Sequence, residues 1–238
     1  DKMETLAGLF GIGERPSGDR DPFALRRHAL GVLRMLMEKG LPLPLQRLVG
    51  LAFDGFPHAA FARCDGEVER FLFDRLRGLL QEQGYSVHEV EAVVSLGPER
   101  IDRVPALLAA VRAFMRLPEA ESLAAANKRI GNILRKADLG GDGATAALDP
   151  ALLREPAERE LARAFERVAP RAENLLAAAD YTGLLMSLAP LKEPVDRFFD
   201  DVMVMVDDAA IRANRLALLA RLRALMNRVA DISLLAAG

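Results

Sequence analysis

The longest regular pattern of apolar positions in this chain lies near its C-terminal end, over residues 207–235. Apolar side chains recur there at spacings of three, four or seven residues, at Ile211, Leu218, Leu222, Leu225, Val229 and Ile232. That spacing is typical of one face of an α-helix, so we expect a single long helix across this region. We also expect the rest of the chain to be organised around it.

Polar side chains on this predicted helix fall into two groups. Four arginines flank the apolar stripe, Arg212 and Arg223 along one margin and Arg221 and Arg228 along the other. Asn214 and Arg215 differ, because a helical projection places them within or beside the stripe. A core helix with such margins can hold a domain together and still offer positive charge to a partner.

Residues 21–39 predict an earlier helix with clear ends. Asp21 is a suitable N-cap, and Pro22 suits the first helical position. Gly40 follows the last turn, where a helix commonly ends. The expected buried face comprises Leu25, Ala29, Val32, Leu33 and Leu36.

Two adjacent arginines near the start of this helix admit two interpretations. Arg26 projects toward the apolar side, where an unpaired guanidinium is costly, so it is expected to pair with Asp19 or Asp21. Arg27 lies on the opposite side of the helix. In the alternative interpretation, Arg26 and Arg27 together bind a phosphate of a ligand.

The middle of the chain predicts further helices separated by glycine and proline. A short helix or turn follows the paired prolines of 41–50, whereas 51–66 has no clear period. A helix is expected at 67–83, a short helix at 86–96, and a third at 102–116 that Asp102 can cap. Ser86 and Glu89 have the spacing of a capping box at the start of the second of these.

A second domain is expected to begin near Pro118, which gives domains of residues 1–116 and 117–238. Its first helix, over 118–137, has an apolar face of Leu123, Ala126, Ile130, Ile133 and Leu134. The opposite face carries only cationic or amide side chains: Lys128, Arg129, Asn132, Arg135 and Lys136. One interpretation is a solvated face whose charges favour the helix C-terminus. The other is a surface that contacts phosphates or bases.

The remaining chain predicts a flexible loop at 138–150 and a helix at 156–180, either bent near Pro170 or broken into two helices. A short helix at 181–189 follows. In 194–208 the side chains expected to pack inward are Val195, Phe198, Phe199, Val202 and Met203. Four aspartates there are interpreted as a helix cap, as solvent-facing groups or as arginine partners rather than as a metal cluster: Asp200, Asp201, Asp207 and Asp208.

Composition favours helices over sheets, because alanine, leucine and arginine dominate and tryptophan is absent. We therefore expect an all-α protein of two helical domains, and 238 residues with 51% hydrophobic content suffice for their cores. The single Cys64 excludes an internal disulfide and suggests a reducing cytoplasm. The sequence contains neither a signal peptide nor an uncharged run long enough to span a bilayer. Because it begins at Asp1 inside a helical pattern, we expect a piece of a longer protein.

The chemistry carried by the sequence is sparse. A net charge of −2 argues against indiscriminate binding of nucleic acid, so a polyanion would need a local basic patch. None of the three histidines has a partner at ligand spacing: His28, His58 and His88. Three aspartates lack the spacing of a calcium loop: Asp138, Asp142 and Asp149. Since no activated nucleophile, P-loop or dinucleotide motif is found, we expect no catalytic centre, metal or cofactor in this chain.

Three stretches together resemble the C-terminal part of the β subunit of the bacterial, two-subunit glycyl-tRNA synthetase. They are 1–34, AAANKRIGNIL at 124–134, and the stretch 194–235 that begins PVDRFFDDVMVMVDD. The second and third also resemble the helical anticodon-binding domain of arginyl-type synthetases, which carries an Asp-Ala-Leu-Arg signature. Here that position reads Ala209-Ala210-Ile211-Arg212, so only the alanine and the arginine agree.

The resemblance implies that glycine is activated with ATP and Mg²⁺ on a separate α subunit, in an assembly of two α and two β subunits. It also implies that the β subunit binds glycine tRNA, with this end toward the anticodon and with no DNA or membrane partner. In the family, the preceding segment belongs to a region that resembles HD-type phosphohydrolases. Asp1 aligns roughly with the last acid of that motif, but the upstream histidines are absent, so a residual hydrolase is disfavoured.

The basic face of 118–137 is the first choice for the anticodon end. Arginine and lysine hold an RNA backbone, and unstacked anticodon bases can be read on their edges. Asn132 is the best candidate for a base edge, because an amide both donates and accepts hydrogen bonds. Two further pairs are candidates: Arg212 and Arg223, if their helix packs beside this one, and Arg26 and Arg27 as a second contact.

Two matters stay open at this level. Aromatic residues are few, so stacking on bases is expected to involve arginine planes or Tyr181. The competing hypothesis is an all-helical protein–protein docking module without RNA contact, in which the last helix or its neighbours bind a partner protein.

Overall fold

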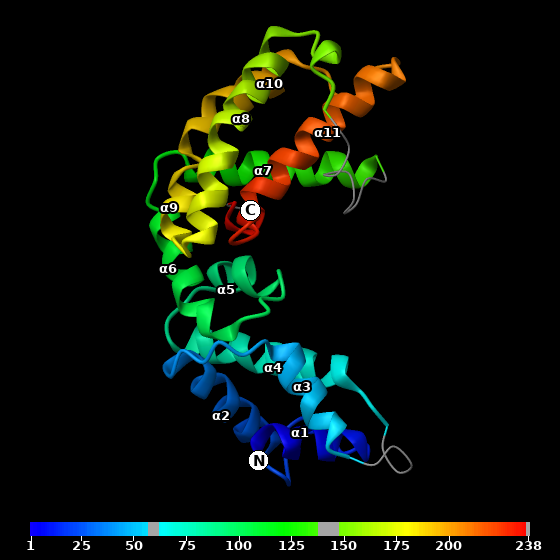
Figure 1. The fold of residues 1–238 in the computed structure, drawn as a ribbon, viewed down its shortest axis with the longest axis vertical. Coiled ribbons are helices and arrows are strands. Elements are labelled where there is room, and N and C mark those ends of the chain that lie inside the picture. Colours follow the sequence, from blue (N-terminus) through cyan, green and yellow to red (C-terminus); the bar gives the residue numbers. More distant parts are fainter. Residues whose placement is uncertain (57–61, 138–147, 237–238) are drawn as a thin grey trace. The chain divides into compact units, whose positions relative to one another are not determined.

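The computed structural model describes residues 1–56, 62–137 and 148–236, which form helices and turns without a β-sheet (Figure 1). The predicted all-α class is therefore confirmed. By its internal contacts the chain divides into two compact units, Asp1–Ala106 and Leu107–Gly238. The division falls inside helix α6 (Val104–Phe114), earlier than the boundary placed after residue 116 from the sequence. Most of the loop expected at 138–150 lies outside the described residues.

The first unit is a small helical bundle, and five α-helices lie wholly within its described residues. They are α1 (Lys2–Gly11), α2 (Leu25–Glu38), α3 (Leu45–Asp54), α4 (Asp65–Glu82) and α5 (Val87–Val94). Helix α1 packs against α2, α3 and α4, while α4 also packs against α2, α3 and α5. The core takes one apolar face from each helix and includes Leu6, Leu33, Val49, Leu72 and Val90. The capping box expected at Ser86 and Glu89 is present at the start of α5.

Helix α2 buries all five residues predicted for its apolar face. It begins at Leu25 rather than at the predicted Pro22, because Ala24 adopts a left-handed backbone conformation with φ of 52°. Asp21 nevertheless caps this end, since its carboxylate accepts hydrogen bonds from the backbone N–H groups of Leu25 at 2.8 Å and Arg26 at 3.0 Å. Gly40 follows the helix with φ of 57°, as expected for a glycine at a helix end.

Asp102 was expected to cap the helix that follows it, and this prediction is wrong. Asp102 lies inside the short 3-10 turn η2 (Ile101–Arg103), and its carboxylate accepts hydrogen bonds from Nε and Nη2 of Arg100, both at 2.7 Å. The Asp102 side chain is only 10% exposed. The adjacent Arg100 guanidinium therefore holds the pKa of Asp102 below its usual range.

This pair predicts a specific pH dependence of stability. A carboxyl whose pKa is lowered in the folded state contributes stability that is present above its unfolded pKa and is lost as pH falls through the folded pKa. We expect Asp102→Asn to lower the free energy of unfolding by about 1.5 kcal/mol at neutral pH. The difference between the two proteins should shrink below about pH 4. Urea unfolding over a pH series measures it, and a difference that is constant with pH would contradict this role.

The second unit contains α7 (Ala120–Lys136), α8 (Pro156–Ala177), α9 (Tyr181–Met186), α10 (Lys192–Asp201) and α11 (Ala209–Met226). Helix α11 packs against both α7 and α8, and α10 also lies against both of these helices (Figure 1). Helix α8 runs through Pro170 without interruption, so the alternative of two separate helices is wrong.

The last helix is shorter and more deeply buried than its apolar stripe predicts. It ends at Met226, and Ile232 belongs to a separate 3-10 turn, η6 (Ile232–Leu235), which packs against α7. Val229 and Ile232 are nevertheless buried, because the chain turns back toward the core after the helix. Every side chain from Asn214 to Ala220 is buried, so the helix has neighbours on all sides there.

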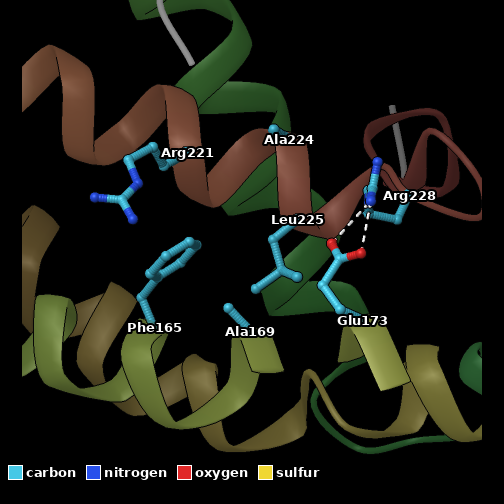
Figure 2. Close-up of a pocket in the computed structure, with 7 residues that line it drawn as sticks. All are labelled: Phe165, Ala169, Glu173, Arg221, Ala224, Leu225 and Arg228. Atoms are coloured by element: carbon cyan, nitrogen blue, oxygen red, sulfur yellow. Dashed lines mark hydrogen bonds and ion pairs between the residues drawn. The ribbon is translucent and has the colours of Figure 1, made fainter. Parts of the chain in front are cut away.

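The contact between α8 and α11 uses the arginines of one margin of the predicted stripe. Phe165 of α8 points toward Leu225 of α11 (Figure 2). The Arg221 guanidinium lies over the Phe165 ring, 5.0 Å from its centroid. Arg228 forms an ion pair with Glu173 at 2.7 Å. Both guanidinium groups therefore help to hold the two helices together.

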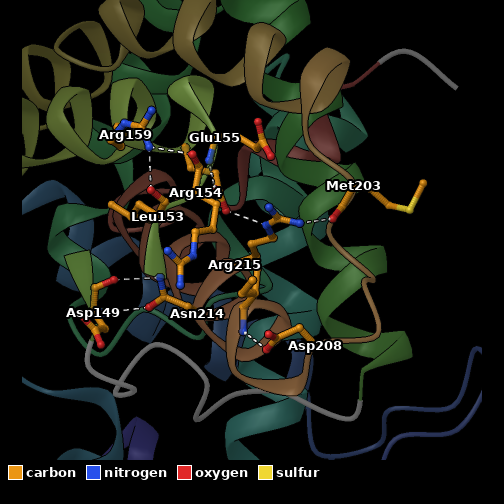
Figure 3. A network of polar contacts seen from close by, with 11 residues as sticks. Asp149, Leu153, Arg154, Glu155, Arg159, Met203, Asp208, Asn214 and Arg215 are labelled. Carbon is orange, nitrogen blue, oxygen red and sulfur yellow. Dashed lines mark hydrogen bonds and ion pairs between the residues drawn. The ribbon is translucent and has the colours of Figure 1, made fainter. Parts of the chain in front are cut away.

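Arg215 lies in the interior of this unit, as its place in the apolar stripe suggested. Its Nε donates to a carboxylate oxygen of Glu158 at 2.6 Å, and the two side chains are 6% and 0% exposed. Its Nη1 donates to the backbone carbonyl of Met203 at 2.7 Å (Figure 3). The other Glu158 oxygen accepts from the backbone N–H of Glu155 at 2.6 Å. One buried ion pair thus connects α8, α11 and the segment between α10 and α11.

Asn214 makes a second buried polar connection. Its Nδ2 donates to the backbone carbonyl of Asp149 at 3.0 Å, and its Oδ1 accepts from the backbone N–H of Asp149 at 2.8 Å (Figure 3). The amide therefore satisfies both backbone groups of one residue, as a neighbouring strand would.

Met203 was expected to pack inward, and this is wrong: its side chain is 73% exposed. Helix α10 ends at Asp201, and Val202 has extended backbone angles. Along an extended chain successive side chains point to opposite sides. Val202 and Val204 are accordingly buried, whereas Met203 and Met205 are exposed.

The buried ion pair predicts a large effect on stability. We expect Arg215→Met to lower the free energy of unfolding by about 3–5 kcal/mol, because it leaves the Glu158 carboxylate buried without its cation. The matched variant Arg228→Met breaks an exposed pair with Glu173 and should cost less than about 1 kcal/mol. Urea denaturation of both variants tests this, and equal losses would contradict it.

Candidate nucleic-acid interface

The five residues predicted as a basic surface lie on one exposed face of α7. This surface, called here the α7 face, comprises Lys128, Arg129, Asn132, Arg135 and Lys136, all of which are exposed. The opposite side of the helix is fixed in the core by buried residues that include Leu123, Ile130 and Leu134. The amphipathic pattern of the sequence therefore determines which side of α7 faces solvent.

Most of the α7 face is free to contact a partner. Within the described ranges, Lys128, Asn132, Arg135 and Lys136 form no hydrogen bond or ion pair with another residue. Many other arginines of this unit are already engaged, for example Arg197 with Glu160 and Arg228 with Glu173. Free cations on one face create a local positive field even though the whole chain carries a charge of −2.

Arg129 differs from its neighbours because it stacks on an aromatic ring. Its guanidinium carbon lies 4.1 Å from the centroid of Phe199 on α10. Phe199 is half-buried rather than fully inward, since it lies at the edge where α7 and α10 meet. A planar guanidinium held in this way keeps its charge and has a restricted orientation.

A hollow of about 400 Å³ opens beside this stacked pair, between α7 and α10. It is called here the α7–α10 hollow, and its lining residues are Ser122, Ala125, Ala126, Arg129, Asp196, Phe199 and Asp200. Asp196 accepts hydrogen bonds from Ser122 Oγ at 3.0 Å and from Lys192 Nζ at 2.7 Å. The same contact with Asp196 raises the pKa of Lys192.

Arg212 and Arg223 were candidates on the condition that their helix, α11, packs beside α7, and this condition is met. Helices α7 and α11 do pack together, with Arg223 lying against Gly131 of α7. The Arg223 guanidinium is, however, 3.5 Å from Asp231. Arg212 donates to the backbone carbonyl of Val206 at 2.6 Å. Both arginines are therefore partly used within the fold.

Arg26 and Arg27 belong to the first unit, whereas α7 belongs to the second. The guanidinium of Arg26 donates to the backbone carbonyl of Gly18, and the predicted pairing with Asp19 or Asp21 is wrong. Asp21 instead accepts from backbone N–H groups at the start of α2. Arg27 is exposed, as predicted.

Two features of the second unit were missed in the sequence. The first is the α7–α10 hollow. Its signal was the spacing of Asp196, Phe199 and Asp200 on one face of a helix, and it was missed because Phe199 was assigned to the core. The second is a row of arginines at every fourth position of α8: Arg159, Arg163, Arg167 and Arg171. The last three are exposed, but glutamates alternate with them along the helix, so this row is less positive than the α7 face.

The part of the chain that the structure describes shows neither a metal site nor a membrane-spanning helix. It contains no group of three or more His, Cys, Asp or Glu side chains that could hold a metal ion. None of its helices is both long enough and apolar enough to cross a bilayer.

Comparison with known families agrees with the helical architecture. Residues 123–232 match the family model described as DALR anticodon binding domain. These residues include α7 with its exposed cations and continue to the turn after α11. The second unit thus contains a helical segment of the DALR class.

Residues 1–95 match a second family model, described as Glycyl-tRNA synthetase beta subunit. Across its whole length the chain is 60% identical to the glycine–tRNA ligase beta subunit of Thiobacillus denitrificans. It is 56% identical to that of Methylobacillus flagellatus and 54% identical to that of Dechloromonas aromatica. The chain belongs to the family of glycyl-tRNA synthetase β subunits, as its resemblance indicated, and spans 33% of the length of these relatives.

Gly131 of α7 lies so close to Arg223 of α11 that we expect a larger side chain at this position to be poorly tolerated. A Cβ at this position would lie 3.0 Å from Nε of Arg223, so Gly131→Ala must displace that side chain. Gly78 in α4 has open space around it, and Gly78→Ala should raise the free energy of unfolding by about 0.5–1 kcal/mol through helix propensity. We expect Gly131→Ala to lack this gain or to destabilise by about 1 kcal/mol. Thermal unfolding compares the two, and an equal gain would contradict tight packing.

Proposed function

We propose that this chain is the part of a glycine–tRNA ligase β subunit that binds the anticodon end of glycine tRNA. In the proposed enzyme a separate α subunit activates glycine with ATP and Mg²⁺, in an assembly of two α and two β subunits. The observation that carries the proposal is the α7 face, inside a segment that matches the DALR anticodon-binding family. Four of its side chains have no hydrogen-bond or ion-pair partner among the described residues: Lys128, Asn132, Arg135 and Lys136. The names of the relatives reported above identify the proposed enzyme as a ligase and its amino acid as glycine.

The physics of the α7 face suits an RNA backbone. Each Lys or Arg that neutralises a phosphate releases condensed counterions, which favours binding and makes it depend on salt. Residues Lys128, Arg135 and Lys136 are the proposed phosphate contacts, since their charges are free of acidic partners among the described residues. Asn132 lies between them on the same face and can both donate to and accept from a base edge.

The docking-module alternative receives less support from the fold. It required an accessible apolar face on the last helix or its neighbours. Helix α11 is buried on all sides from Asn214 to Ala220, so that stretch has no apolar surface to offer a partner. Met203 and Met205 are exposed just before α11, and they stand on a short extended segment rather than on a helix face.

The α7 face predicts a change in the salt dependence of tRNA binding. In the whole α and β enzyme, Lys128→Ala with Arg135→Ala should weaken binding of glycine tRNA. The slope of log affinity against log salt should fall by about one unit per lost phosphate contact. Filter binding between roughly 50 and 200 mM salt measures both effects.

Arg163→Ala with Arg167→Ala on α8 is the matched control, because it removes the same charge from exposed positions of the same unit. An unchanged slope for the α7 variant, with normal folding, would rule out the α7 face. A slope change confined to the α8 variant would move the RNA surface to that helix. Loss of α-subunit binding with unchanged tRNA binding would favour the docking module.

A further inference from the structure

The α7–α10 hollow lies at the edge of the α7 face and has a chemistry of its own. We propose that it holds one unstacked cytosine of the glycine anticodon, stacked on Arg129 and read by the carboxylate of Asp200. This inference rests on the proposed function and adds the residues that select the base. It concerns sequence specificity, whereas the α7 face concerns the RNA backbone.

The platform for the base is the Arg129 guanidinium. The guanidinium carbon lies over the Phe199 ring, 4.1 Å from the ring centroid, and the residue is exposed to solvent. A guanidinium plane is one of the surfaces on which proteins stack unpaired RNA bases. Ala125 and Ala126 form part of the wall, and their small side chains leave room for a flat ring. Arg129 is thus our candidate for the arginine plane that the aromatic-poor sequence was expected to use for stacking on a base.

The reading group is Asp200, which stands one turn beyond Asp196 on the same face of α10. Asp196 is held by Ser122 and Lys192, whereas Asp200 is exposed and forms no hydrogen bond or ion pair with another described residue. An ionised carboxylate only accepts hydrogen bonds. It therefore favours the exocyclic amino group of cytosine and repels the carbonyl oxygen that uracil has at the same place.

Cytosine is chosen over the other amino-bearing bases because of the genetic code. All glycine codons begin with two guanines, so the second and third bases of every glycine anticodon are cytosines. The first anticodon base varies among glycine tRNAs. A pocket that serves all of these tRNAs must therefore read one of the two cytosines.

The test measures base preference in the whole α and β enzyme. Dissociation constants are determined for glycine tRNA transcripts with the normal anticodon and with uracil at its second or third position. Asp200→Asn should lose most of the preference for cytosine at one of these positions, a change of about tenfold in the ratio, because an amide can donate to uracil. Its salt slope should stay unchanged, since no phosphate contact is removed.

Matched variants separate reading from stacking and from general charge effects. Asp201→Asn removes the neighbouring exposed carboxylate, which does not line the hollow, and should keep the full preference. Arg129→Lys keeps the charge but removes the plane, and Phe199→Leu removes the ring beneath it. Both should weaken binding of the normal tRNA by about tenfold without changing the salt slope. Thermal unfolding of each variant checks that the fold is intact.

Two results would overturn the inference. Asp200→Asn could keep the wild-type preference for cytosine, or Asp201→Asn could lose that preference equally. If the α7 variant lowers the salt slope and Asp200→Asn keeps the preference, only the cytosine pocket fails. If the α7 variant leaves the slope unchanged, the proposed function itself fails.

Discussion

The buried ion pair between Glu158 and Arg215 is the constraint on which the second unit depends. A guanidinium inside a core is tolerated only when its hydrogen bonds are satisfied, and here a carboxylate and the Met203 carbonyl satisfy them. The same contacts fix where α8 begins and where the chain leaves α10. Helix α10 in turn carries Phe199 and Asp200, so the interior pair supports the geometry of the hollow without touching it.

Sequence periodicity predicted most of what depends on a single helix. The buried face of α2 and the exposed face of α7 follow from one repeat of 3.6 residues, and the capping box at Ser86 follows from local spacing. Periodicity could not locate the end of α11, because Val229 and Ile232 continue the apolar pattern and are buried by a turn instead. An apolar pattern therefore predicts which residues are buried, but it does not predict whether the helix continues through them.

The sequence predicted the charged residues of the candidate site, but it did not predict which residues they contact. Arg129 and Arg223 look alike in sequence, yet one lies on Phe199 and the other between Gly131 and Asp231. Which guanidinium is engaged depends on residues far away in the chain, and no local spacing encodes them. For the same reason the hollow was missed, since its two walls come from α7 and α10, which are separated in the sequence by α8 and α9.

The amide of Asn214 has a consequence for how this family can vary. By holding both backbone groups of Asp149, it anchors the chain immediately before η4 (Pro150–Leu152) and α8. Changes in the length of the connection that precedes residue 149 can then be absorbed without shifting the start of α8. Evolution can thus lengthen or shorten that connection at small entropic cost, while one asparagine keeps the register of the bundle.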